Sequence, residues 1–265
     1  MMTHDRHWKD KKVNIKMIVT DLDKTLLRSE VFISEYTADV FKQCRSKGIK
    51  TAFATARSIR AADRFIRQIM PDIFIGFGGA LVLEGEKVIK RKDIPPDVSC
   101  RLIQECDFES DVLGVYAINE SVALTSIQNH ATDYPHYQYS DFSDSSKLSF
   151  LKISVRAANP QVMERIALHL PMLHMIRFTG EDLYMFANRN ATKWRAVKAA
   201  ADFYGFSTET ILAFGDDVND LEMIINCGVG VAVDNAIDEV KAVADYICDT
   251  NDNDGVAKWI EENLF

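Results

Sequence analysis

The chain has 265 residues, of which 47% are hydrophobic and 26% are charged. A chain of this length can bury a substantial core and is at or beyond the usual size of a single domain. With 31 basic and 39 acidic residues, the net charge is −8, which argues against a general nucleic-acid-binding protein. Small anionic ligands remain compatible with this charge, because a few local cations or a bound metal decide whether they bind.

The sequence shows no sign of export or of membrane insertion. Residues 1–16 are polar and lack the apolar core of a signal peptide. No apolar run approaches the roughly 20 residues that cross a bilayer. The five cysteines are scattered and form no C-x-x-C pair. We therefore expect a cytoplasmic protein with reduced thiols and with neither a membrane nor nucleic acid as its partner. The sequence does not indicate an oligomeric state.

The first 80 residues alternate short apolar runs with amphipathic stretches. They predict strands at 17–21, 50–56 and 73–80 and helices at 34–48 and 58–70. This alternation is typical of an α/β domain with a Rossmann-like parallel sheet that is covered by helices on both faces.

The pattern changes in the middle of the chain. Here the sequence predicts a hairpin at 81–90, helices at 97–108 and 160–170, strands within 112–126 and 149–156, and a second hairpin at 173–187. Hairpins with interleaved helices indicate an α+β domain inserted into the parallel-sheet domain. We place this insert at 81–188, so that 1–80 and 189–265 together form the core domain.

The α/β pattern returns in the last part of the chain. It predicts helices at 190–205, 218–228, 235–244 and 253–265 and strands at 211–217, 229–233 and 245–248. These elements extend the parallel sheet that the first 80 residues begin.

Polar residues follow several of the predicted parallel strands. Asp21 and Asp23 end the first strand, Thr55 ends the second, and Asp216 follows "ILAFG". In open α/β sheets the ligand binds at the carboxyl ends of the strands, so these side chains are expected to converge. Carboxylates gathered in this way repel one another unless a cation lies among them, and an all-oxygen ligand set suits Mg²⁺. Two acids separated by one residue, Asp21 and Asp23, also allow one to act as a nucleophile on phosphorus and the other as a general acid.

Four motifs resemble those of the haloacid dehalogenase (HAD) superfamily, in the order of that family. "DLDKT" (21–25) is similar to the first motif, D-x-D-x-T, and Thr55 in "FATAR" resembles the second. Lys193 in "NATKW" resembles the third motif, and "GDDVND" (215–220) resembles the fourth, G-D-x-x-N-D. The insert between the second and third motifs resembles the cap of the Cof-like branch, subfamily IIB.

The resemblance implies an Mg²⁺-dependent enzyme with the HAD fold. Asp21 would be the nucleophile that becomes an aspartyl-phosphate, and Asp23 would be the general acid and base. The metal ligands would be Asp21, Asp23 through its carbonyl, Asp216, and Asp220 directly or through water. The phosphate-binding residues would be Thr55, Ala56, Lys193 and Asn219, with Asn219 also orienting Lys193.

Among several departures from the usual family pattern, two lie close to the predicted site. Lys24 stands where most relatives have glycine, and a requirement for φ > 0 there would cost lysine about 1 kcal/mol or more. Gly78 stands where the family usually has asparagine, so one polar contact near the substrate is expected to be missing. Neither change removes a catalytic group.

The function that fits these features is hydrolysis of a small phosphorylated metabolite, a sugar phosphate above all. A phosphomutase with the same intermediate and a catalytically silent module that binds phosphate esters are the alternatives. Taken singly, Asp21 and Asp23 also fit a solvated strand end, Thr55 a turn residue and Lys193 a surface lysine. In the stretch 133–146, Tyr134, His136 and Tyr137 are candidates for the substrate face, although an exposed loop is the more usual role of such a stretch.

Overall fold

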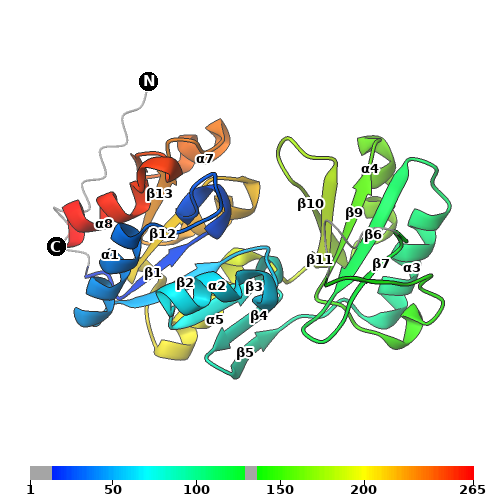
Figure 1. The fold of residues 1–265 in the computed structure, drawn as a ribbon, viewed down its shortest axis with the longest axis horizontal. Helices are drawn as coiled ribbons and strands as arrows, with labels where there is room; N and C mark the ends of the chain where they lie inside the picture. Colours follow the sequence, from blue (N-terminus) through cyan, green and yellow to red (C-terminus); the bar gives the residue numbers. More distant parts are fainter. Residues whose placement is uncertain (1–13, 129–135) are drawn as a thin grey trace. The chain divides into compact units, whose positions relative to one another are not determined.

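The structure, a computed structural model, describes residues 14–128 and 136–265. The chain divides into two compact units, one reaching Lys90 and resuming at Thr192–Phe265, the other formed by Arg91–Ala191. Each unit is built around a sheet of its own (Figure 1).

The first unit contains an eight-stranded sheet in the order β14-β13-β12-β1-β2-β3-β4-β5. The six strands from β14 to β3 pair in parallel, and β4 pairs antiparallel to β3. The strands are β1 (Met17–Thr20), β2 (Lys50–Ala54), β3 (Ile73–Gly76), β4 (Leu81–Glu84), β5 (Lys87–Arg91), β12 (Ile211–Gly215), β13 (Val229–Val233) and β14 (Tyr246–Cys248).

Helices cover both faces of this sheet. The chain steps in one direction from β1 to β3 and in the other from β12 to β14, so right-handed crossovers place their helices on opposite faces. One group, whose members contact one another, is α1 (Glu35–Ser46), α2 (Ile59–Ile69) and α8 (Gly255–Leu264). The other group is α5 (Lys193–Tyr204), α6 (Leu221–Asn226) and α7 (Asp238–Val243). The parallel sheet between two helical layers, predicted from the sequence, is confirmed.

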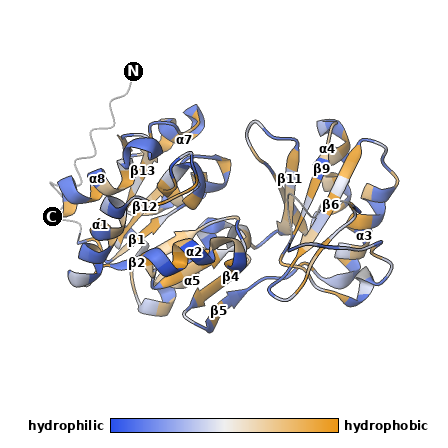
Figure 2. Ribbon diagram, viewed as in Figure 1, coloured by the Kyte–Doolittle hydropathy of each residue, from blue (hydrophilic) through white to orange (hydrophobic). Residues whose placement is uncertain are grey.

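The parallel strands are buried on both faces, which explains their continuous apolar sequences. All residues of β1, β12 and β13 are buried. Figure 2 shows these strands as hydrophobic and the helices as mixed, with hydrophilic residues along part of each surface. The helices begin where the sequence predicts: the side chains of Ser34 and Ser58 accept hydrogen bonds from the first turns of α1 and α2.

The second unit contains a six-stranded sheet in the order β10-β11-β9-β6-β7-β8, antiparallel except for the parallel pair β7 and β8. Its strands are β6 (Val112–Ile118), β7 (Ala123–Thr125), β8 (Gln138–Tyr139), β9 (Lys152–Ala157), β10 (Leu173–Arg177) and β11 (Leu183–Asn188). Apolar residues of α3 (Pro96–Asp107) and α4 (Pro160–His169) share a core with these strands. This unit is therefore an α+β domain.

The first hairpin of the middle region belongs to the larger sheet and not to the insert, contrary to the prediction. We expected the insert to begin at residue 81, but β4 pairs with β3 and continues the larger sheet into β5. The reason is the short turn η3 (Phe77–Gly79), in which all three residues have positive φ and reverse the chain back onto β3. The boundary of the second unit therefore lies at Arg91 and Ala191 instead of at 81 and 188.

Several predicted elements are shorter in the structure. The helix expected from residue 190 begins at Lys193, because the side chain of Thr192 caps it. The helix expected over 218–228 is divided into a 3₁₀ turn, η6 (Val218–Asp220), and α6. The other single turns are η2 (Leu22–Leu26), η4 (Ser145–Lys147), η5 (Thr208–Thr210) and η7 (Asn251–Asn253).

Among residues 14–128 and 136–265, no helix combines the length and the apolar character that crossing a membrane requires.

Candidate active site

The register of the parallel strands brings the predicted site residues to one edge of the first unit's sheet. Thr20, the last residue of β1, lies opposite Phe214 of β12 and Phe53 of β2. The N–H group of Asp21 then donates to the carbonyl of Phe214 at 3.1 Å, which extends the strand pairing by one residue. Asp21 and the residues that follow β12 and β2 therefore leave the sheet at the same level.

Asp21 is held by a buried lysine. Nζ of Lys193 donates to Oδ1 of Asp21 at 2.7 Å and to Oδ1 of Asp220 at 2.6 Å. The Lys193 side chain is 1% exposed, so this is a buried charge between two carboxylates and not the surface lysine that its helical position alone would indicate. The third motif thus contacts the first and the fourth.

The position of Lys193 depends on a glycine in η3. At Gly79, whose φ is +105°, a Cβ atom would lie 2.4 Å from the carbonyl carbon and oxygen of Thr192. Only glycine combines this conformation with so close an approach. The turn after β3 therefore packs directly against the residue that caps α5.

Asp216 and Asp220 lie beside Asp21. One carboxylate oxygen from each of these three residues lies within 4.8 Å of the others. Oδ1 of Asp216 accepts from the hydroxyl of Thr25 at 2.7 Å. Oδ2 of Asp220 accepts from the N–H groups of Asp216 and Asp217, which fixes the loop after β12. This loop also needs Gly215, where a Cβ atom would meet Asp220 at 2.5 Å.

The charges in this cluster are not balanced by the protein. Burial raises the pKa of Asp21 well above its usual value, and Asp220, Asp216 and Asp23 add to the rise, whereas Lys193 opposes it. Burial and the neighbouring Asp220 raise the pKa of Asp216 to about 7. For Lys193, burial disfavours the charge, but Asp21 and Asp220 outweigh it and raise the pKa. Three carboxylates around one lysine therefore fit a site for an additional cation with oxygen ligands, such as Mg²⁺.

The second acid of the first motif has a different environment. The Asp23 side chain is 49% exposed and its carboxylate is outside the cluster of three, paired instead with Arg57 at 2.5 and 2.8 Å. It lies on η2, where Lys24 has φ 58°. Lys24 therefore has the positive φ that would make a lysine costly at this position. Asp23 thus lies on a strained turn at the rim, two residues from the buried Asp21.

Thr55 lies in the loop that follows β2. It is buried, and its hydroxyl oxygen accepts from the N–H group of Arg57 at 3.1 Å, which leaves the hydroxyl proton to donate to a ligand. Its carbonyl accepts from Gly78, whose φ is 70°, so the glycine at this position fits a left-handed conformation in η3. Ala56 lies next to Thr55 in the same loop. Ser58, and not Thr55, caps α2.

The position of Asn219 differs from what its predicted role suggests. The polar contacts of Lys193 are with Asp21 and Asp220, and the amide oxygen of Asn219 is buried without a hydrogen-bond partner among the described residues. An orienting role toward Lys193 therefore belongs to Asp220 in this structure, and phosphate binding by Asn219 stays a prediction. Asp217 caps η6, as expected of a turn residue.

Sequence reasoning missed two side chains of the site, Arg57 and Thr25. Both lie inside the quoted motifs, Arg57 in "FATAR" and Thr25 in "DLDKT". Their spacing in the sequence could have indicated them, because each lies two residues after a predicted site residue. Thr25 follows Asp23 and bonds to Asp216, and Arg57 follows Thr55 and bonds to Asp23. Of the candidates in 133–146, Tyr134 lies outside the described residues. The ring of Tyr137 packs edge-to-face against that of Tyr116, with ring centroids 5.5 Å apart.

The family follows from a match over most of the chain. A family model described as haloacid dehalogenase-like hydrolase matches residues 18–260. The chain belongs to this family. A Haemophilus influenzae relative is 30% identical over 260 residues, covering 94% of this chain and 98% of its own length. A Bacillus subtilis relative, 5-amino-6-(5-phospho-D-ribitylamino)uracil phosphatase YitU, is 26% identical. The match covers 93% of this chain and 96% of that relative.

Solved structures show the same two-domain fold as this HAD hydrolase. The structure of a HAD subclass IIB sugar phosphatase has a TM-score of 0.83 at 22% identity, and the match covers 93% of this chain and 98% of the other. The structure of a HAD phosphatase from Bacteroides thetaiotaomicron has a TM-score of 0.84 at 24% identity. The match covers 95% of this chain and 96% of the other. The chain is thus a HAD hydrolase whose fold is the subclass IIB, Cof-like architecture, as the motifs indicated.

Proposed function

We propose that this HAD phosphatase hydrolyses a small phosphorylated metabolite, a sugar phosphate above all, with Mg²⁺ and through an aspartyl-phosphate on Asp21. The observation that carries this proposal is the contact of Asp21 with the buried Lys193, beside Asp216 and Asp220. Two similar proteins support the substrate class, since one is a 5-amino-6-(5-phospho-D-ribitylamino)uracil phosphatase and the other, a structural neighbour, is a sugar phosphatase.

Asp21 would carry the phosphoryl group. Lys193 holds Oδ1, so the second oxygen, Oδ2, attacks phosphorus while the bond from phosphorus to the leaving oxygen breaks. For this step Asp23 leaves its pair with Arg57 and carries a proton, which it donates to that leaving oxygen. Asp23 then takes a proton from water, which attacks the phosphorus of the aspartyl-phosphate, releases phosphate and restores Asp21.

The other residues of the site would bind the phosphate group. The hydroxyl of Thr55 and the ammonium of Lys193 donate to its oxygens, and Ala56 and Asn219 complete the predicted phosphate site. The metal would be held by Asp21, Asp216, the carbonyl of Asp23, and Asp220 directly or through water. When bound, Mg²⁺ supplies positive charge that offsets the charge of the transferring group.

Hydrolysis of p-nitrophenyl phosphate tests this proposal. We expect wild-type turnover that stops when EDTA is added, and an Asp21→Asn variant that folds but has lost activity by at least about 10³-fold. Asp202→Asn is the matched control, because Asp202 is exposed and pairs only weakly with Lys198 on α5. If Asp21→Asn hydrolyses as fast as wild type, Asp21 is not the nucleophile.

Released phosphate that carries oxygen from labelled water supports hydrolysis, whereas an isomerised sugar phosphate without release identifies a mutase.

A further inference from the structure

The turn that carries Asp23 is bound by residues from the last part of the chain. Four side chains make these contacts, and we call them the C-terminal clamp: Asn235, Asn251, Asp252 and Asp254. They contact η2 and the segment that connects it to α1, all within the first unit. The clamp therefore joins parts of the chain more than 200 positions apart in sequence.

Two asparagines bind the backbone of the turn itself. Nδ2 of Asn235 donates to the carbonyl of Lys24 at 2.7 Å, and Nδ2 of Asn251 donates to the carbonyl of Leu27 at 2.8 Å. The two asparagines are also joined, because the N–H group of Asn251 donates to Oδ1 of Asn235 at 2.9 Å. Asn251 is buried, so a lost bond there would leave the Leu27 carbonyl unsatisfied.

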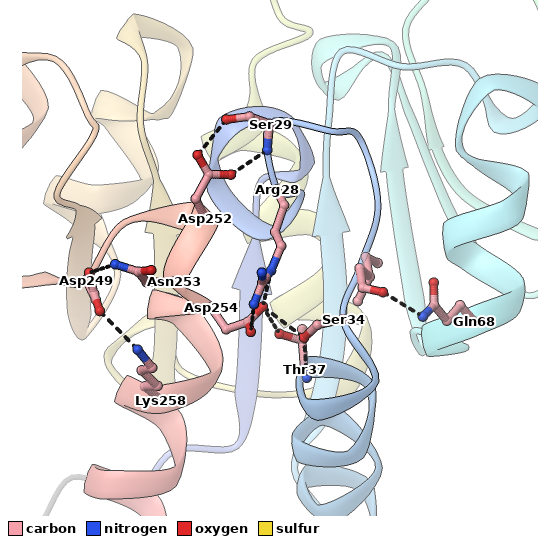
Figure 3. Close-up of polar contacts among 11 residues, drawn as sticks. Arg28, Ser29, Ser34, Thr37, Gln68, Asp249, Asp252, Asn253, Asp254 and Lys258 are labelled. Carbon is pink, nitrogen blue, oxygen red and sulfur yellow. Dashed lines mark hydrogen bonds and ion pairs between the residues drawn. The ribbon is translucent and has the colours of Figure 1, made fainter.

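Two aspartates bind the segment after the turn (Figure 3). Asp254 accepts from Arg28 and from the hydroxyls of Ser34 and Thr37, which lie at the start of α1. Asp252 accepts from the N–H group and the hydroxyl of Ser29. The connection from β1 to α1 is thus fixed at both of its ends.

We propose that Asn235 and Asn251 are positioning residues that orient Asp23 for proton transfer to the leaving group, an inference that rests on the proposed function. Asp23 is half-exposed and its carboxylate pairs with Arg57, and the residue after it is held in a left-handed conformation. The position from which the Asp23 side chain extends depends on the backbone of η2 and of Leu27, the residue that follows it, and the two asparagines bind one carbonyl in each. Asp21 does not share this dependence, because β12 and Lys193 fix it.

A comparison of two leaving groups separates a role in positioning Asp23 from a general loss of structure or activity. A p-nitrophenolate leaves without much help from an acid, whereas benzyl alcohol, of similar size, needs protonation as it leaves. For Asn235→Ala and Asn251→Ala we expect kcat/KM for benzyl phosphate to fall about tenfold, and kcat/KM for p-nitrophenyl phosphate to stay within about twofold. Asp23→Asn should show the same selectivity with a larger loss, about 10²- to 10⁴-fold on benzyl phosphate.

Asn253→Ala is the matched control. Asn253 belongs to the same turn, η7, but its side chain bonds to Asp249 beside it, so both substrates should be hydrolysed at the wild-type rate. Urea denaturation monitors folding, and Asn235 is exposed, so its variant gives an answer even if Asn251→Ala does not fold.

The outcomes separate the two proposals. If wild type and Asp23→Asn behave as stated, but the clamp variants keep the wild-type ratio of the two substrates or lose both activities equally, the positioning role is wrong and the proposed function stands. If wild type hydrolyses neither ester, or Asp23→Asn shows no selectivity, the proposed function fails and the positioning role fails with it.

Discussion

Replacing Lys193 by methionine tests whether the site depends on a buried countercharge. Nζ lies 2.7 Å from Asp21 and 2.6 Å from Asp220, and at an effective dielectric constant near 20 each contact corresponds to about 6 kcal/mol of Coulomb energy. Burial of the three groups offsets most of this gain. The net cost of removing one partner from a buried ion pair is about 3–5 kcal/mol, out of a total stability of about 5–15 kcal/mol. Methionine fills a similar volume, so the lost charge is the main change.

The assay is urea denaturation with EDTA present, followed by p-nitrophenyl phosphate hydrolysis with Mg²⁺. We expect Lys193→Met to unfold at a clearly lower urea concentration and to lose at least about 10²-fold in kcat. Lys198→Met on the same helix is the control. That lysine is 57% exposed and pairs with Asp202 at 3.2 Å, so its loss should change stability by less than about 0.5 kcal/mol. An unfolding midpoint for Lys193→Met equal to that of wild type would show that Lys193 does not neutralise the cluster.

Two further predictions concern the strained turn and the metal. Lys24→Gly should raise stability by up to about 1 kcal/mol, since φ is 58° there, whereas Lys42→Gly inside α1 should lower it by about 1 kcal/mol. A lower melting temperature for Lys24→Gly would contradict this. In EDTA, stability should fall as the pH rises from about 4 to about 7, because the pKa of Asp216 is raised to about 7 in the folded state. Mg²⁺ competes with these protons, so its stabilisation in thermal melts should be larger near pH 8 than near pH 5.5. Equal stabilisation by Mg²⁺ at the two pH values would argue against a metal site at Asp21, Asp216 and Asp220.

The sequence predicted the parallel sheet and the convergence of the acids because both follow from local patterns. Apolar runs mark buried strands, and parallel strands end at one edge, so Asp21 and Asp216 had to meet there. The four motifs in order also led to Lys193, whose helix alone indicates a surface position. These predictions needed no information about contacts between distant parts of the chain.

What the sequence could not predict depends on such contacts. The pairing of Asp23 with Arg57 depends on how two loops face each other, and the bonds of Asn251 to Leu27 join residues 224 positions apart. The prediction that the hairpin β4–β5 belongs to the insert is wrong because the sequence of the hairpin fits either sheet. Its partner is decided by three successive positive-φ residues in η3, one of them Phe77, a residue type that rarely adopts this conformation.

The topology of the site sets an order on its assembly during synthesis. β1, which leads into Asp21, lies between β2 and β12, and the lysine that neutralises Asp21 comes 172 residues later. The ribosome therefore has to add the whole second unit and then α5 and β12 before the centre of the sheet can close. Until then a newly made chain exposes one edge of β1, a strand that is buried in the folded protein, and this state is prone to aggregation. Contacts so distant in sequence also favour slow folding, which lengthens the time that this edge stays unpaired.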